Sequence, residues 1–341
     1  METAGTSPKR IPECGNAPGA SRNVLKTSPI GQPTGTFPNA ALNAVLCSER
    51  SPKTSTRTEV IPAMSPAKTI CAMHDLSSVG RSALTAIIPT LSAMGVQTIP
   101  APTAVLSAHT AFPHPVITDL TDYLRRCTDY WQEMHIRFDC IYTGYMSSPG
   151  QEQIAQKLMQ NAPNAFRLVD PVLGDDGEMY QGLPETMIPA MRSLCHSADL
   201  ITPNLTEAAL LTGAPCSNHP LTTPALTNLL KRLRALGPKT ALVTGVRLEN
   251  RAVNAWMDET NALHTCEYER VPASFPGTGD LFAAVLAGAM TRGDSLESAV
   301  RLASDFVSAA MRNTMECQTP PNLGVQLEKT LEMLIPKGGQ S

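Results

Sequence analysis

The chain has 341 residues, a formal net charge of −3, 42% hydrophobic residues and 17% charged residues. This length and hydrophobic content suffice to bury a sizeable core in one large α/β domain or in two smaller domains. The acidic balance argues against a nucleic-acid-binding protein, which would carry a clustered basic excess. No apolar run approaches 18 residues, and the N-terminus lacks the apolar stretch of a secretory signal. We therefore expect a cytoplasmic protein that does not enter a membrane.

Residues 1–66 differ in composition from the rest of the chain. Pro, Thr, Ser and Gly supply 29 of these 66 residues, and Phe37 is the one aromatic residue. Such a segment buries too little apolar surface to offset the entropy of ordering, so we predict a disordered leader over 1–66 and a folded domain over 67–341. Seven Lys and Arg against four Asp and Glu give the leader a charge of +3. A basic, hydroxyl-rich leader is typical of organelle transit peptides, whereas its acids and prolines fit an accessory tail.

From Lys68 onward, strand-like apolar runs alternate with helical ones. We predict strands over residues 68–73, 96–99, 138–143, 166–169, 200–202 and 240–244. The predicted helices between them cover residues 81–94, 149–161, 185–195, 205–212 and 223–236. An antiparallel strand pair follows at 252–257 and 262–268, and then helices at 279–291 and 296–315 and an amphipathic stretch at 323–334. This alternation predicts a mostly parallel sheet with helices on both faces, which binds ligands beyond the carboxyl ends of its strands.

The most informative motif is Pro-Gly-Thr-Gly-Asp at residues 276–280, which runs into Leu-Phe-Ala-Ala. Gly277 and Gly279, on either side of Thr278, let the backbone turn tightly and approach a ligand closely. The N–H groups of the helix that follows would form an anion hole for a phosphoryl group in transfer. Asp280 beside this hole could accept a proton from an attacking hydroxyl group, or it could serve only as the cap of the helix.

Two acidic loops also follow predicted strands. DPVLGDDG begins at Asp170 and includes Asp175, and TPNLTE ends at Glu207. Mg²⁺ takes few direct protein ligands and keeps several waters, so these carboxylates are candidate metal ligands. The alternative roles are a polar turn for the first loop and a contribution to the helix dipole for Glu207. Thr244 ends a further strand, where its hydroxyl group could meet a nucleotide phosphate.

Polar side chains follow the first two predicted strands as well, and they could form hydrogen bonds to a small polar ring. They are His74, Asp75, Ser107, His109 and Thr110. A single histidine at such a place is more often structural than functional. Neither GxxxxGK[ST] nor a GxGxxG after a strand occurs, so neither a P-loop nor a Rossmann dinucleotide site is supported.

The segments DPVLGDDGEMY, TPNLTEAALLTG and PGTGDLFAA, in this order and spacing, resemble the ribokinase-like superfamily and, within it, the pyridoxal (vitamin B6) kinases. HDLSSVGRSALT and TAVLSAHT look most like the bacterial-type branch. The resemblance covers about residues 68–315 and implies a three-layer α/β sandwich. It also implies ATP and Mg²⁺ as cofactors, admits a monovalent cation, and suggests a homodimer. The implied reaction is phosphorylation of the 5′-hydroxymethyl group of pyridoxal, pyridoxamine or pyridoxine, in vitamin B6 salvage.

The resemblance also implies roles for individual residues. Asp280 would be the catalytic base, and Gly277, Thr278 and Gly279 would form the anion hole for the γ-phosphoryl group. The residues implied around ATP are Asp170, Asp175, Thr202, Asn204, Glu207 and Thr244, with Asp175 and Glu207 at the metal. Those implied around the pyridine ring are His74, Asp75, Ser107, His109, Thr110 and Asp280. The chain departs from the family where many members place a ring-contacting serine, because His74 or Asp75 stands there, and because the usual TVQFSNHT reads TAVLSAHT.

Three other interpretations are compatible with parts of the sequence. A hydroxymethylpyrimidine (phosphate) kinase of thiamine synthesis shares the fold and the TPNLxEA-type segment, but such enzymes commonly have cysteine where this chain has Asp280. A sugar kinase of the superfamily usually carries a longer glycine-rich N-terminal signature and lid strands. A non-catalytic B6-binding protein could keep the fold, but the intact Asp280 and its glycine loop argue against one.

Overall fold

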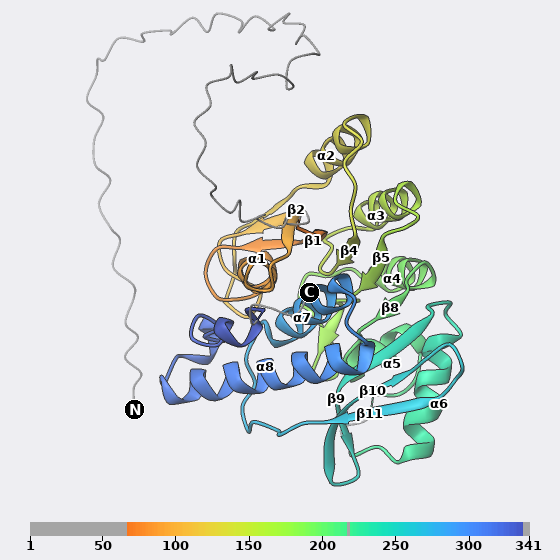
Figure 1. The fold of residues 1–341 in the computed structure, drawn as a ribbon, viewed down its shortest axis with the longest axis vertical. Coiled ribbons are helices and arrows are strands. Elements are labelled where there is room, and N and C mark those ends of the chain that lie inside the picture. Colours follow the sequence, from red (N-terminus) through yellow and green to blue (C-terminus); the bar gives the residue numbers. More distant parts are fainter. Residues whose placement is uncertain (1–66, 217–218, 337–341) are drawn as a thin grey trace, which may run out of the picture. The chain divides into compact units, whose positions relative to one another are not determined.

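The computed structural model describes residues 67–216 and 219–336 (Figure 1). The predicted leader over residues 1–66 lies outside the described residues. In the part that is described, no helix combines the length and apolar character needed to cross a membrane.

A nine-stranded sheet forms the centre of the described domain, in the order β11-β10-β9-β8-β5-β4-β1-β2-β3. Its strands are β1 (Thr69–Ser77), β2 (Gln97–Leu106), β3 (Ile117–Asp119), β4 (Cys140–Thr143), β5 (Phe166–Val169), β8 (Leu200–Ile201), β9 (Thr240–Leu248), β10 (Arg251–Met257) and β11 (Leu263–Glu267). The strands from β9 to β2 in this order are parallel to one another, whereas β3, β10 and β11 are joined by antiparallel pairings. The predicted mostly parallel sheet and the antiparallel pair after it are confirmed.

Helices cover both faces of this sheet, as predicted (Figure 1). They are α1 (Ala83–Ala93), α2 (Thr121–Glu133), α3 (Pro149–Asn161), α4 (Met187–His196), α5 (Leu205–Thr212), α6 (Thr223–Arg234), α7 (Thr278–Arg292) and α8 (Leu296–Glu316). Buried side chains of α2 to α6 pack in one hydrophobic core, and those of α1, α7 and α8 pack in another. The domain is therefore a three-layer α/β sandwich.

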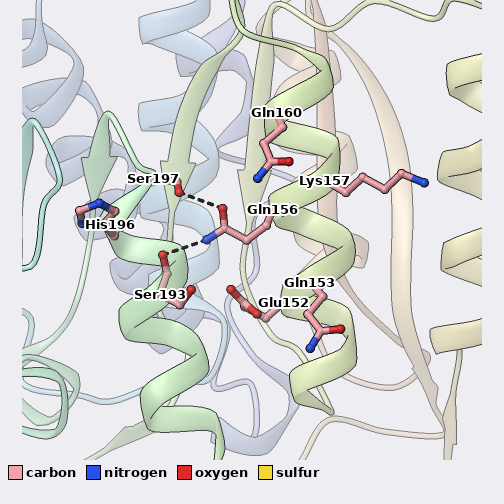
Figure 2. Close-up of a pocket in the computed structure, with 8 residues that line it drawn as sticks. All are labelled: Glu152, Gln153, Gln156, Lys157, Gln160, Ser193, His196 and Ser197. Carbon is pink, nitrogen blue, oxygen red and sulfur yellow. Dashed lines mark hydrogen bonds between the residues drawn. The ribbon is translucent and has the colours of Figure 1, made fainter.

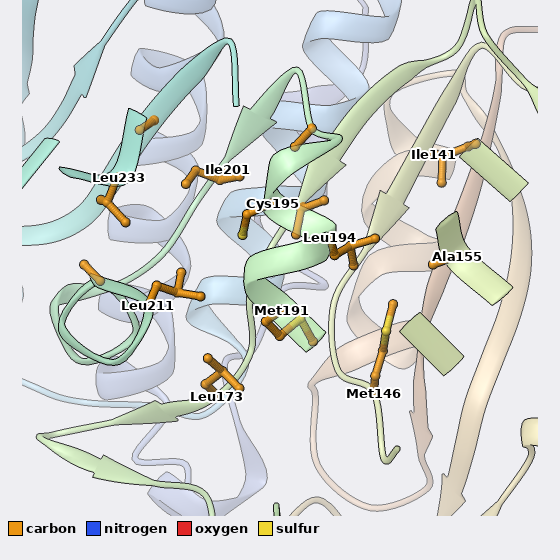
Figure 3. Packing of buried hydrophobic residues seen from close by; sticks show 14 of the residues in the cluster. Ile141, Met146, Ala155, Leu173, Met191, Leu194, Cys195, Ile201, Leu211 and Leu233 are labelled. Carbon is orange, nitrogen blue, oxygen red and sulfur yellow. The ribbon is translucent and has the colours of Figure 1, made fainter. Parts of the chain in front are cut away.

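The interior strand β1 contributes to both cores because successive side chains of a strand point to opposite faces. Ile70 and Ala72 lie in the core with α1, α7 and α8, whereas Cys71 and Met73 lie in the other core. Figure 3 shows part of the latter, where side chains of α4 such as Met191 meet residues of neighbouring elements. Burial on both faces explains the nearly continuous apolar sequence at the start of β1.

The structure also corrects several predicted boundaries. β1 continues to Ser77 beside β2, with an irregular register between His74 and Leu76, whereas the prediction ended the strand at residue 73. The stretch at 323–334 is not one helix but two short 3₁₀ turns, Pro321–Leu323 and Leu331–Leu334. α2 and β3 were not predicted, because few of their side chains are buried to set an apolar pattern. A small hairpin of β6 (Gly174–Asp175) and β7 (Glu178–Met179) was missed as well.

Candidate active site

A cavity of about 620 Å³ opens where the chain leaves the carboxyl ends of the parallel strands. Segments that follow β2, β5 and β8 line it, together with the end of β1 and the start of α7. The predicted site residues that it brings together are His74, Asp75, His109, Thr110, Asp170, Asp175, Thr202, Asn204, Glu207, Thr244, Gly277, Thr278, Gly279 and Asp280. Ser107 is not among the lining residues, and its hydroxyl oxygen accepts a hydrogen bond from the Val116 N–H instead.

The N-terminus of α7 faces this cavity and is formed by the glycine motif. Gly277 is the N-cap residue, with φ of 87° and ψ of −4°, which is a left-handed conformation that favours glycine. A Cβ atom there would also lie 2.1 Å from the carbonyl oxygen of Arg81. The Leu281 N–H donates to the Gly277 carbonyl, so the N–H groups of residues 278–280 precede the hydrogen-bond ladder of the helix. These groups form the kind of anion-binding terminus that the sequence predicts.

Asp280 lies in the first turn of α7 but does not cap it. The interpretation as a helix cap is wrong, because Gly277 occupies that position and no side chain caps the helix. Asp280 Oδ2 instead accepts a hydrogen bond of 2.6 Å from the N–H of Ala83, at the start of α1. Its Oδ1 lies 3.1 Å from His74 Nε2. Burial by itself raises the pKa of Asp280, but the charge of His74 and these contacts outweigh burial and hold the pKa below its ordinary value.

Asp170 and Thr202 form a buried pair across the ends of β5 and β8. The Thr202 hydroxyl donates a hydrogen bond of 3.0 Å to Asp170 Oδ1. Burial, and next the nearby charge of Asp280, raise the pKa of Asp170 to about 7, against the opposing effects of His74 and of the Thr202 hydroxyl. Ionisation of Asp170 beside the charged Asp280 is therefore unfavourable unless a cation lies nearby.

Glu207 lies in the first turn of α5, and main-chain donors hold its side chain. Its Oε1 accepts from the Leu173 N–H at 3.1 Å, and its Oε2 accepts from the Asn204 N–H at 2.9 Å. The Asn204 side chain in turn accepts from the Glu207 N–H at 2.8 Å, which completes a capping box. Asp175 in the nearby hairpin is exposed, and partial desolvation of its carboxyl group raises its pKa. Within residues 67–216 and 219–336, no three His, Cys, Asp or Glu side chains are grouped to hold a metal ion.

The cavity also has polar lining residues that the sequence did not single out, among them Tyr145, Tyr180 and Asn254. Asn254 interrupts the apolar strand β10 and is buried, and its side chain accepts from the Gly245 N–H and donates to the Ser304 hydroxyl. A buried amide within an otherwise apolar strand was the one sequence signal that could have revealed it.

A second hollow lies between α3 and α4, away from these residues (Figure 2). Gln156 spans it, since its amide donates to the Ser193 carbonyl and accepts from the Ser197 hydroxyl. None of the predicted site residues lines this hollow. The cavity at the sheet edge is therefore the candidate active site.

The fold and this site define an α/β phosphotransferase, in which a helix N-terminus can receive a phosphoryl group beside a partly buried carboxylate. The model of the phosphomethylpyrimidine kinase family matches residues 78–322. The chain belongs to this family, and its resemblance to the pyridoxal kinases of the ribokinase-like superfamily is confirmed.

Individual relatives agree with this assignment. The pyridoxal kinase of Ovis aries is 30% identical over 206 residues, which are 53% of this chain and 64% of that enzyme. The crystal structure of pyridoxal kinase from Lactobacillus plantarum has a TM-score of 0.73 and 34% identity, and the match covers 79% of this chain and 97% of that one. A Bacteroides thetaiotaomicron protein, provisionally named a phosphomethylpyrimidine kinase and solved with pyridoxal, has a TM-score of 0.75 and 38% identity over 79% of this chain and 96% of its own.

Proposed function

We propose that this enzyme transfers the γ-phosphoryl group of ATP to the 5′-hydroxymethyl group of pyridoxal, pyridoxamine or pyridoxine. The observation that carries the proposal is the position of Asp280, partly buried in the cavity at the sheet edge, in the helix turn that presents the free N–H groups of residues 278–280. Relatives that are named pyridoxal kinases, and a relative solved with pyridoxal, supply the substrate class. The product would be pyridoxal 5′-phosphate or the corresponding vitamer phosphate.

The chain's own groups account for the chemical step. Asp280, kept ionised, accepts the proton of the attacking hydroxyl group as the new oxygen–phosphorus bond forms. The bond from the γ-phosphorus to the bridging oxygen breaks at the same time, and ADP leaves. The N–H groups at the start of α7 face the transferred group and stabilise its negative charge.

Mg²⁺ would neutralise the ATP phosphates when bound, and the acidic side chains of the cavity fit such an ion. Asp170 and Asp175 present oxygen ligands, and burial raises the pKa of Asp170, a cost that a nearby cation relieves. Both oxygens of Glu207 already accept main-chain hydrogen bonds, so we propose that Glu207 acts on the ion through water. Because these residues form no closed set of ligands, the phosphates and waters would complete the coordination.

The alternative substrate is a hydroxymethylpyrimidine, which the name of the matched family suggests. Asp280 favours a B6 vitamer, since the pyrimidine kinases commonly have cysteine at this position. The presence of pyridoxal in the Bacteroides thetaiotaomicron relative, despite its provisional name, favours the same choice.

The test measures ADP release by the full-length chain with pyridoxal, pyridoxamine, pyridoxine and hydroxymethylpyrimidine, with Asp280→Asn as the matched inactive variant. We expect the highest kcat/KM with a B6 vitamer, and a loss of about 10²–10⁴ in kcat for Asp280→Asn, as is typical when a general base is removed. Preference for hydroxymethylpyrimidine would select the alternative. No turnover with any of the four compounds would indicate a binding protein.

We also propose that the kinase domain comprises residues 67–341 and that it forms a homodimer, as the family resemblance implies. Light scattering on the purified protein, with and without residues 1–66, measures its mass in solution and tests both proposals. Imaging of the full-length and shortened chains in cells would show whether the leader directs the protein to an organelle or leaves it in the cytoplasm.

A further inference from the structure

His74 is a buried histidine that lies between two carboxylates at the end of β1. Its Nδ1 is 2.9 Å from Asp75 Oδ1, and its Nε2 is 3.1 Å from Asp280 Oδ1. The latter is an ion-pair contact rather than a well-aligned hydrogen bond. The side chain of His74 is 4% exposed and that of Asp75 is 9% exposed, so water screens neither pair well.

The surroundings of His74 are built to hold its ring in this place. The Ser77 hydroxyl donates a hydrogen bond of 2.7 Å to Asp75 Oδ2 and so fixes the first carboxylate. The register of β1 shifts between His74 and Leu76, and such irregularities re-aim side chains at the edges of sheets. Gly144, after β4, leaves the room that the ring needs, because a Cβ atom there would lie 2.0 Å from His74 Cδ2.

The two carboxylates favour the doubly protonated ring. A neutral imidazole carries a single N–H and can serve one carboxylate, whereas the imidazolium ion serves both. The Asp75 N–H also lies 3.0 Å from Nδ1, which suits a neutral ring, but one amide dipole acts less strongly than two nearby charges. Burial by itself lowers the pKa of His74, and Asp280 and Asp75 together outweigh it and raise the pKa to about 10.

The other titratable groups around His74 and Asp280 do not reverse the direction of either pKa shift. Asp170, beyond β5, is also acidic, and its charge interacts with both His74 and Asp280. Tyr142 on β4 packs edge-on to His74 and stays neutral, because burial raises the pKa of its hydroxyl group far above the ordinary value. Burial likewise raises the pKa of Tyr180, which also lines the cavity. His109, beyond β2, favours the ionised form of Asp280 as His74 does.

We infer that His74 is a positioning residue for the proposed phosphoryl transfer, which holds the Asp280 carboxylate in place and keeps it ionised for the proton of the substrate. This inference rests on the proposed function. It differs from the role that the resemblance implies, because His74 acts through Asp280 rather than by contacting the pyridine ring. A ring nitrogen that is already protonated cannot take the hydroxyl proton, so Asp280 remains the acceptor.

The test compares the pH profile of kcat/KM for the wild type and His74→Gln. An opposite charge at this distance typically lowers the pKa of a carboxylate by about 1–3 units. Removing it should therefore raise the pH at which activity is lost on the acidic side by about 1–3 units, while KM for ATP stays nearly constant. Asp75→Asn should shift the profile in the same direction. The matched control is His264→Gln, because His264 Nε2 lies 2.8 Å from Asp258 Oδ2 outside the cavity, and this variant should leave the profile unchanged.

A measurement on the substrate-free wild-type protein keeps the inference testable if His74→Gln does not fold. Nitrogen-15 NMR should show both ring nitrogens of His74 protonated at pH 7, and in Asp280→Asn the pKa of His74 should fall. Two results would overturn the inference. One is a neutral His74 at pH 7, and the other is a folded His74→Gln variant whose kcat/KM falls at the same acidic pH as that of the wild type. Neither NMR result depends on turnover, so an inactive protein with a charged His74 would refute the proposed function alone.

Discussion

Gly277 and Gly279 stand two residues apart at the start of α7, but the backbone needs glycine at only one of them. Gly277 has a positive φ, and a side chain there would collide with the main chain of Arg81. At Gly279 an added Cβ atom would meet no other atom within 4 Å. The space above Gly279 is therefore open to a ligand, whereas Gly277 shapes the protein itself.

The two glycines should respond differently to alanine. Gly277→Ala should lower both the melting temperature and kcat, because the strained backbone and the contact with Arg81 must relax by moving α7. Gly279→Ala should keep the wild-type melting temperature, and any change should be confined to kcat/KM for ATP. Thermal unfolding and kcat/KM for ATP of both variants check this prediction. Equal losses of stability would show that the turn needs both glycines.

The kinds of residues in the site could be predicted from the sequence, but their contacts could not. Asp170, Thr202 and Asp280 each follow a strand or open a helix, which places them at one edge of the sheet. The partner of Asp280 is His74. The apolar residues at the start of β1 predict a strand that ends at residue 73, so His74 lies just outside it. Contacts between residues some 200 positions apart depend on the register of β1 and on the placement of α7, which local spacing does not determine.

At the scale of elements, the β6–β7 hairpin is fastened to the start of α5. The Asn204 side chain donates to the Gly174 carbonyl at 2.9 Å while it caps α5, and the Gly177 N–H donates to the Thr206 hydroxyl at 2.9 Å. The hairpin carries Asp175, so these bonds set where that carboxylate lies in the cavity.

Asn204→Ala should loosen this attachment. We expect a loss of about 1 kcal/mol in the free energy of unfolding, the usual effect of removing an N-cap side chain. If Asp175 binds the metal, the Mg²⁺ concentration that gives half-maximal activity should also rise. Urea unfolding and a Mg²⁺ titration measure the two effects. The control is Asn161→Ala, whose side chain bonds to Gln132 on the surface and should affect neither quantity.

Element prediction succeeded where side chains are buried and failed where they are exposed. The ranges of α3, α5 and β5 match the prediction, and these elements have regular buried positions. β3 is exposed along its whole length, so no apolar alternation marks it. The stretch at 323–334 is a different kind of failure. Val325, Leu327 and Leu334 are buried there, as an apolar pattern suggests, but the segment forms two short 3₁₀ turns instead of one helix.

At the scale of the whole molecule, the described residues contain two hydrophobic cores, one on each face of the sheet. Both cores consist of residues from Ile70 onward, and the family model begins at residue 78. The folded domain therefore has its own source of stability within the described chain.

Deletion of residues 1–66 should leave kcat and the melting temperature nearly unchanged. The reason is compositional, since this segment has one aromatic residue, and Pro, Thr, Ser and Gly make up 29 of its 66 residues. Kinetic assays and thermal unfolding of the full-length and shortened chains make the comparison. A large fall in melting temperature would show that part of the segment packs on the domain.

The burial of α7 has a consequence for how the enzyme loses activity. Every residue from Leu281 to Ala289 is buried, and the helix shares its core with α1 and α8. Its amide hydrogens can therefore exchange with solvent only when that core opens, which places the helix with Asp280 in the last cooperative unit to unfold. We therefore expect displacement of α7 on heating to coincide with collapse of the fold rather than to precede it.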